Sequence, residues 1–389
     1  MGIISAIGRT PEEQFSNLVQ AKSGLQKLQQ IDSIYRNKIR VGEINSFNEQ
    51  LAKELNLSHD HNYTRTAILG CLAAKWAVSD AGLSLSDLKN DALISATTVG
   101  GMDMTERYFK EFGSNPEVQK FMDSHEAGDS TNKIAEHLGI DGFVTTISTA
   151  CSSGANALML AARLIRSGKA ERVIAGGTDA LSKFTINGFN SLMILSSEAC
   201  KPFDRHRDGL NLGEAAAYLV LESEASANSR GARIRAWLSG YGNSNDSHHQ
   251  TASSPEGDGA FLAMKAALES SGLQPAQIDY VNAHGTATPN NDLSESKALL
   301  RIFGDSVPPF SSTKPFTGHT LAAAGAVEAV FSILAMEKGV LLPNLNYNEP
   351  IIETALQPET ACTPKALQHV LSNSFGFGGN CTTLILSKP

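Results

Sequence analysis

The chain has 389 residues, of which 41% are hydrophobic and 19% charged, as is usual for a globular protein. Its formal net charge of −8 argues against nucleic acid as a partner, because phosphate binding needs a basic surface. No apolar run is long enough to span a membrane, and the start MGIISAIGRT has neither the basic segment nor the long apolar segment of a signal peptide.

The cysteines indicate a reducing environment. There are five, an odd number, and no two of them form a Cys-x-x-Cys motif: Cys71, Cys151, Cys200, Cys362 and Cys381. Such wide, odd spacing predicts neither a disulfide framework nor a zinc site. We therefore expect a cytoplasmic protein.

Predicted strands and helices alternate along the chain. In chain order we expect a helix over 64–81, a strand over 92–99, a helix over 154–167, strands over 172–175 and 217–221, a helix over 257–271, a strand over 280–283, helices over 292–303 and 325–338, and a strand over 382–386. A glycine suited to a left-handed cap follows each helix: Gly82, Gly168, Gly272, Gly304 and Gly339. This alternation predicts an α/β protein with mostly parallel sheets.

Two helical segments resemble each other, which suggests a duplicated α/β unit. GANALMLAARLIRSG spans 154–168 and GAVEAVFSILAMEKG spans 325–339, and each follows a short polar segment, STAC in one case and TGH in the other. A seam is expected near 228–232. We therefore predict an N-terminal half over 1–230 and a C-terminal half over 231–389.

Four segments contain residues suited to catalysis, and the first surrounds Cys151. The apolar stretch 143–147 runs into STAC, and a helix follows. This places the thiol at a helix N-terminus, where the dipole and free N–H groups favour the nucleophilic thiolate. The alternative is a buried structural cysteine.

The second and third segments each present a histidine. NAHGTATPNND delivers His284 from a strand end, with hydroxyls at Thr286 and Thr288 for a polar ligand, or is simply a turn with an incidental histidine. KPFTGHTLAAAGAVEA carries Lys314, His319 and Glu328. Glu328 is either a surface residue or a buried carboxylate paired with Lys314 that positions both histidines.

The fourth segment, NSFGFGGN over 373–380, alternates glycines with two phenylalanines. It predicts either a tight turn between strands or a gate whose backbone N–H groups bind an oxyanion.

Together these motifs resemble the β-ketoacyl-acyl-carrier-protein synthases, condensing enzymes of the thiolase superfamily. The matching segments are TACSSG, VIAGGTDA, KPFDRHRDG, LGEAAAYLVLE, NAHGTATPNND, SSTKPFTGHTLAAAGAVEA and NSFGFGG. The resemblance covers essentially the whole chain. It implies a five-layered αβαβα fold whose two duplicated halves each contain a mixed, mostly parallel sheet.

The resemblance also implies a role for each matching residue. Cys151 would carry the acyl chain, His284 and His319 would promote decarboxylation of malonyl carrier protein, and Lys314 would order the site. The remaining roles are support by Glu328 and Asp292, binding of the phosphopantetheine arm by Thr286 and Thr288, acyl-channel contacts from Phe375 and Phe189, a gate at Phe377, and an oxyanion hole from the N–H groups of Phe377 and Cys151.

The implied reaction is a decarboxylative Claisen condensation that needs no metal or other cofactor. The implied partners are acyl carrier protein and a second copy in a homodimer, with a chain-length factor as the alternative partner in a heterodimer. Two other identities are weighed: a thiolase, which uses coenzyme A and a second cysteine, and a non-catalytic chain-length factor, which usually lacks the active cysteine. The pair of histidines and the Phe-Gly loop argue against the thiolase, and the presence of Cys151, His284, Lys314 and His319 argues against the chain-length factor.

The sequence departs from the family pattern at several points. It starts inside the first matching segment, and the loop FMDSHEAGDSTNKIAEHLGIDG before the nucleophile is unusual, which leaves chain-length preference open. Asn380 and Cys381 stand where Thr-Asn is usual, Ala215 where glycine is common, and Ala287 where serine is frequent. The last feature and the altered Phe-Gly loop look more like synthases of aryl-polyene or flexirubin-type pigments than fatty-acid elongation.

Overall fold

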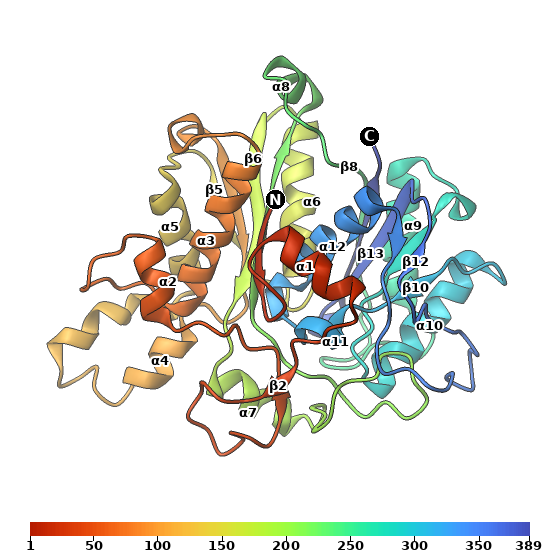
Figure 1. Cartoon of the computed structure of the whole chain (residues 1–389), viewed down its shortest axis with the longest axis horizontal. Helices are drawn as coiled ribbons and strands as arrows, with labels where there is room; N and C mark the ends of the chain where they lie inside the picture. Colours follow the sequence, from red (N-terminus) through yellow and green to blue (C-terminus); the bar gives the residue numbers. More distant parts are fainter.

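A computed structural model describes all residues 1–389 and shows five layers, alternately helical and β (Figure 1). Two five-stranded sheets lie on either side of a central helical layer, and further helices cover the outer face of each sheet. This is the five-layered α/β arrangement that the sequence predicted. No helix in the structure is both long and apolar enough to cross a membrane.

The first sheet comes from the first half of the chain, and its strands lie in the order β1-β7-β6-β4-β5. They are β1 (Gly2–Ser5), β4 (Ala92–Ala96), β5 (Val144–Ile147), β6 (Arg172–Asp179) and β7 (Ala215–Glu222). Helices α3 (Arg65–Asp80) and α5 (Ala127–Leu138) pack on the outer face through a cluster of buried aliphatic side chains.

The second sheet repeats this plan with strands in the order β10-β9-β13-β14-β8. They are β8 (Trp237–Asn245), β9 (Tyr280–Asn282), β10 (Phe310–Ser311), β13 (His369–Phe375) and β14 (Asn380–Ser387), and α9 (Asp258–Ser271) and α10 (Pro289–Phe303) cover them outside. When the five strands of each half are numbered in chain order, and the first sheet is read from its β5 edge, both sheets have the strand order 3-2-4-5-1. The same pairs are parallel and antiparallel in each. The predicted duplication is therefore confirmed, but two of the four pairings in each sheet are antiparallel, so the sheets are less parallel than expected.

The central layer consists of the two helices whose sequences resemble each other, α6 (Ser153–Arg166) and α12 (Ala324–Lys338). Their starts touch closely. A Cβ on Gly154 would lie 2.7 Å from the carbonyl oxygen of Ala322, and one on Gly325 would lie 2.6 Å from the backbone nitrogen of Ala155. Glycine at both helix starts thus brings the segments that carry Cys151 and His319 together.

The remaining α-helices and strands are short. They are the helices α1 (Pro11–Val19), α2 (Asn48–Glu54), α4 (Met102–Tyr108), α7 (Lys183–Ser191), α8 (Glu224–Ser229) and α11 (Lys314–Thr317), and the two-residue strands β2 (Gln26–Lys27), β3 (Arg40–Val41), β11 (Val340–Leu341) and β12 (Thr363–Pro364).

Predicted and observed boundaries differ most in β6, which is eight residues long rather than four. The strand continues through Gly176 and Gly177, which a search for apolar runs does not register. A Cβ on Gly176 would lie only 2.0 Å from the carbonyl oxygen of Ala217, so close packing requires glycine there. Gly304 also differs from prediction, because its ψ of −139° lies outside the left-handed helical region.

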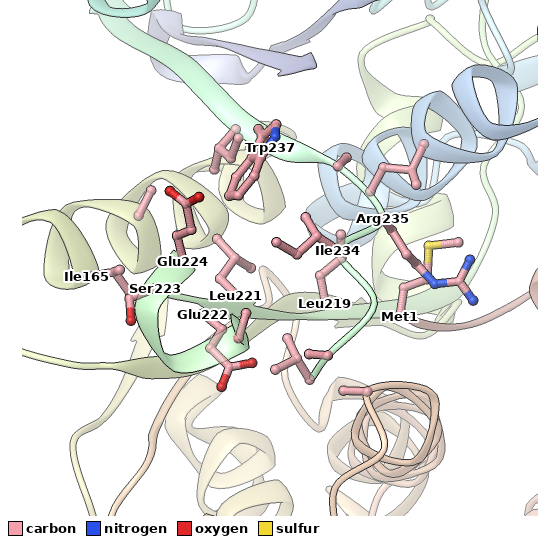
Figure 2. A pocket seen from close by; sticks show the side chains of 18 of the residues that line it. Met1, Ile165, Leu219, Leu221, Glu222, Ser223, Glu224, Ile234, Arg235 and Trp237 are labelled. Atoms are coloured by element: carbon pink, nitrogen blue, oxygen red, sulfur yellow. The ribbon is translucent and has the colours of Figure 1, made fainter. Parts of the chain in front are cut away.

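Strand β1 pairs with only the first half of β7, residues 215–218. Beside the unpaired half lies a cavity of about 690 Å³. Figure 2 shows its lining, which includes Met1, Leu219, Leu221 and Ile234. None of the predicted site residues lines this cavity.

Candidate active site

Cys151 lies between the edge strand β5 and helix α6, in a sharply bent turn. The preceding residue, Ala150, has a φ of +52°, a conformation that costs energy for a residue with a side chain. The turn directs the thiol inward, where Cys151 is only 6% exposed. The predicted strand–turn–helix setting of the nucleophile is therefore present.

The sulfur is held as a thiol by its surroundings. Burial raises the pKa of the Cys151 thiol to about 11, although the Lys314 ammonium and the backbone N–H groups of Phe377 and Cys151 act in the opposite direction. Those two N–H groups therefore lie near the sulfur, and the turn that carries Phe377 packs on the nucleophile segment, since a Cβ on Gly376 would lie 3.1 Å from the nitrogen of Cys151. A negative charge that develops beside the sulfur would meet the same donors.

His284, in the loop after β9, and His319, between α11 and α12, converge on Cys151. Their ring centroids are 5.5 Å apart and the rings are nearly perpendicular. One potential ligand atom from each of the three residues lies within 4.8 Å of the other two. Sequence reasoning placed these residues together, and the structure brings them together.

Both imidazoles are neutral at pH 7. The pKa of His284 lies well below its ordinary value because of burial, the charge of Lys314 and the proximity of His319, and the pKa of His319 is lowered by burial and by Lys314. The Nδ1 atom of His319 accepts a hydrogen bond of 3.1 Å from the backbone N–H of Leu321. Its proton must therefore be on Nε2.

The Lys314 ammonium fixes the second ring in the same way. Its Nζ donates to Oε1 of Glu328 at 2.6 Å and to the carbonyl oxygen of His284 at 2.5 Å, and lies 3.3 Å from Nδ1 of His284. Three acceptors match the three N–H groups of an ammonium. Because Nδ1 of His284 accepts from this ammonium, the proton of the ring is on Nε2.

The predicted partnership of Lys314 with a buried Glu328 is present, but it positions only one histidine directly. His319 is held instead by its backbone N–H, which donates to the carbonyl oxygen of Asn211 at 2.7 Å, and by Leu321. Glu328 is not the surface residue of the alternative interpretation, since it is 2% exposed.

Asp292 was expected to support the same network as Lys314 and Glu328, but it forms a hydrogen bond with neither residue. Its carboxylate accepts hydrogen bonds from the backbone N–H groups of Phe203 at 2.8 Å and Ala287 at 3.1 Å, so it braces the loop after His284. Asp292 lies in the first turn of α10, directly after this loop, and its carboxylate is used by the backbone of the loop.

Glu295 is a positioning residue that the sequence reasoning missed. Its carboxylate accepts from the backbone N–H groups of His284 at 2.9 Å and Gly285 at 2.8 Å, and from Nδ2 of Asn373 at 3.1 Å. A signal was available, because Glu295 follows Asp292 by three residues on one face of the same helix.

The reactive groups open into a cavity of about 290 Å³ whose walls include Thr286 and Thr288. Among the residues that line it, Phe377 stacks on Phe189 with ring centroids 5.8 Å apart, and the ring centroids of Phe375 and His284 are 5.7 Å apart. The two threonine hydroxyls are 2.8 Å apart. All the predicted substrate-binding residues therefore line this cavity.

A strained turn presenting a thiol, two N–H groups facing it and two neutral imidazole donors define a site for acyl transfer through a thioester. Comparisons with known proteins agree. Two family models match, "Beta-ketoacyl synthase, N-terminal domain" over residues 1–227 and "Beta-ketoacyl synthase, C-terminal domain" over residues 235–348.

Relatives match over the full length of the chain. A 3-oxoacyl-[acyl-carrier-protein] synthase 2 of Staphylococcus aureus (strain N315) is 34% identical, with 100% of this chain and 97% of the relative covered. The ishigamide ketosynthase/chain length factor has a TM-score of 0.92 at 31% identity, covering 100% and 97% of the two chains. A type II polyketide ketosynthase in complex with its acyl-carrier protein, AntDE:AntF, has a TM-score of 0.88 at 29% identity, covering 100% and 98%. The chain belongs to the β-ketoacyl synthase family of condensing enzymes.

Proposed function

We propose that this protein joins an acyl chain to a malonyl-derived two-carbon unit, both carried on acyl carrier protein, and releases carbon dioxide and a β-ketoacyl carrier protein. The observation that carries the proposal is the convergence of the Cys151 thiol with two imidazoles that both present Nε2–H. A thiolase would need a second cysteine as base; Cys381 lines the same cavity, but the groups that converge with Cys151 are the two histidines. A non-catalytic chain-length factor would not need this set of groups.

In the first half-reaction the Cys151 sulfur attacks the carbonyl carbon of the acyl thioester. The tetrahedral oxyanion lies against the N–H groups of Phe377 and Cys151, which lie near the sulfur. The carbon–sulfur bond to the carrier then breaks, and the departing pantetheine sulfur takes the proton that the Cys151 thiol gives up. One such N–H donor is worth on the order of 3 kcal/mol in the transition state.

In the second half-reaction malonyl thioester loses carbon dioxide. The electron pair of the broken carbon–carbon bond forms an enolate, whose oxygen the Nε2–H groups of His284 and His319 stabilise. The enolate carbon then attacks the acyl carbon on Cys151, and the sulfur leaves. Lys314 and the backbone of Leu321 fix the tautomers that this step requires.

We propose that no metal takes part, although a thiol and two imidazoles could in principle bind zinc. A histidine that binds a metal through Nε2 carries its proton on Nδ1. In His319 that atom faces a backbone N–H, and in His284 it faces the Lys314 ammonium. In a metal-bound state the Nδ1–H of each ring would therefore face another N–H donor, and the Lys314 ammonium would repel a cation.

Water must be kept from the acyl-enzyme, and Phe377 stacked on Phe189 supports a gate that does so. Thr286 and Thr288 are proposed to hold the phosphopantetheine arm, because their hydroxyls line the same cavity.

We propose a homodimer formed through β5. This strand is the edge of its sheet, and Phe143, the residue directly before it, is 54% exposed. An exposed edge with an apolar neighbour favours pairing with the same edge of a second copy. Pairing with a chain-length factor is the alternative, since one similar structure is of a ketosynthase/chain length factor.

The pathway is proposed to be pigment or polyketide synthesis rather than fatty-acid elongation, with Ala287 and Cys381 as the supporting features.

The five cysteines are all free, which supports a reducing compartment such as the cytoplasm. The division into halves over 1–230 and 231–389 is proposed on the repeated strand order.

Intact-mass measurement tests the proposal. Incubation with a defined acyl carrier protein should add one acyl mass to the parental protein and none to Cys151→Ala, and malonyl carrier protein should then release β-ketoacyl product only from the acylated parental protein. Product formed by Cys151→Ala at the parental rate would overturn the proposal, as would an adduct on another residue.

A further inference from the structure

Asn380, the first residue after the Phe-Gly turn, has a side-chain oxygen on which three donors converge. Ser152 Oγ lies 2.7 Å from this Oδ1, Asn156 Nδ2 lies 2.8 Å from it, and Asn243 Nδ2 lies 2.9 Å from it. The donors come from the residue after the nucleophile, from helix α6 and from strand β8. The oxygen thus connects both halves of the chain beside the active site.

The orientation of the Asn380 amide is determined by its neighbours. Asn156 and Asn243 both direct NH₂ groups at it, and the oxygen of Asn156 already accepts from Asn243 at 3.1 Å and from Thr382 at 2.8 Å. A nitrogen in place of the Asn380 oxygen would face two other nitrogens that carry hydrogens. The position therefore requires an acceptor.

The backbone of Asn380 closes the turn that carries Phe377. Its carbonyl oxygen accepts from the N–H of Gly376 at 2.8 Å. The turn lies directly on the nucleophile segment, because a Cβ on Gly376 would be 2.7 Å from the carbonyl oxygen of Thr149 and 3.1 Å from the nitrogen of Cys151. A small shift of this turn would move the Phe377 N–H relative to the sulfur.

We propose that Asn380 is a positioning residue: its side-chain oxygen ties the gate turn 376–380 to the nucleophile turn and so keeps the Phe377 N–H directed at Cys151. Its effect on acyl transfer rests on the proposed function, but its effect on the thiol does not. Asn380 contacts no reacting atom, and it acts through Ser152 and Phe377.

The test measures alkylation of Cys151 by iodoacetamide between about pH 8 and pH 12, a range that includes the raised pKa of the thiol, followed by peptide mass mapping so that Cys362, which is partly exposed, is counted separately. Asn380→Leu should slow alkylation at pH 8 about tenfold, the factor expected for loss of one hydrogen bond to a charged group, and should shift the pH midpoint upward. Asn380→Asp, which keeps an acceptor, should stay within about twofold of the parental rate.

Two further variants keep the test decisive. Asn243→Ala removes one donor from an exposed side chain, so the fold should survive even if Asn380→Leu does not, and alkylation should slow about threefold. Ser239→Ala removes hydrogen bonds between the same strands at the far end of β14 and should leave the profile unchanged.

The proposal is overturned if Asn380→Leu and Asn243→Ala alkylate within about twofold of the parental protein at every pH. It is also overturned if Asn380→Asp is as slow as Asn380→Leu, or if Ser239→Ala shifts the midpoint equally. Alkylation needs no acyl substrate, so a parental protein that transfers no acyl group would remove the proposed function without deciding the role of Asn380.

Discussion

Replacing Glu328 with alanine should destabilise the protein because it leaves a buried ammonium without its counter-charge. The side chains of Lys314 and Glu328 are each only 3% exposed, and their charged atoms are 2.6 Å apart. Breaking such a pair by removing one partner typically costs about 3–5 kcal/mol. The carbonyl oxygen and the Nδ1 atom of His284 remain as acceptors for the ammonium, but neither carries a negative charge.

This cost can be converted into a melting temperature. At about 2.1 cal/mol/K per residue, the 389 residues give an unfolding entropy of roughly 0.8 kcal/mol/K. Glu328→Ala should therefore lower Tm by about 4–6 °C in calorimetry at fixed protein concentration. The double variant Lys314→Met, Glu328→Leu should regain most of the loss yet stay inactive, because nothing then fixes the His284 tautomer.

A surface pair supplies the control. Lys297 and Glu256 also lie 2.6 Å apart, but Glu256 is 67% exposed, so Glu256→Ala should cost less than about 1 kcal/mol. Equal Tm losses for the buried and surface variants would refute the reasoning. A double variant less stable than Glu328→Ala would refute it as well.

Three further predictions concern pH, water and metals. Burial raises the pKa of Glu295 to about 7. The protonated carboxyl therefore stabilises the fold fully below the ordinary carboxyl pKa, and about 3 kcal/mol of this stability is lost as the pH rises through 7. Glu295→Gln should reduce the difference in unfolding free energy between pH 5 and pH 8, and an unchanged difference would contradict this assignment. Phe377→Ala should still accept an acyl group on Cys151 but hydrolyse it about tenfold faster, as followed by loss of the acyl mass, because the stack on Phe189 is gone; an unchanged lifetime would argue against the gate. Treatment with EDTA should leave acyl transfer unchanged within about twofold, and a loss that a divalent ion restores would contradict the metal-free mechanism.

Much of the site was predictable because its signals are local. A strand running into a small-residue turn and a helix marks the position of Cys151, and the Gly-Ala pairs in the first turns of α6 and α12 mark two equivalent helix starts. The duplicated architecture followed from the resemblance between these two segments, and strand order confirmed it.

The partners of the buried polar groups were not predictable in the same way. That Asp292 braces Phe203, that Glu295 holds the backbone of His284 and that Asn380 collects donors from both halves depend on residues up to 228 positions apart in the chain. By itself the sequence determined the type of each element that it predicted and the identity of the reactive residues, because periodicity, caps and turns involve neighbouring residues. Only the tertiary structure decided tautomers, the neutral state of the histidines and the positions of the supporting residues, since these depend on which distant groups the packing brings within hydrogen-bond distance and on how completely it excludes water.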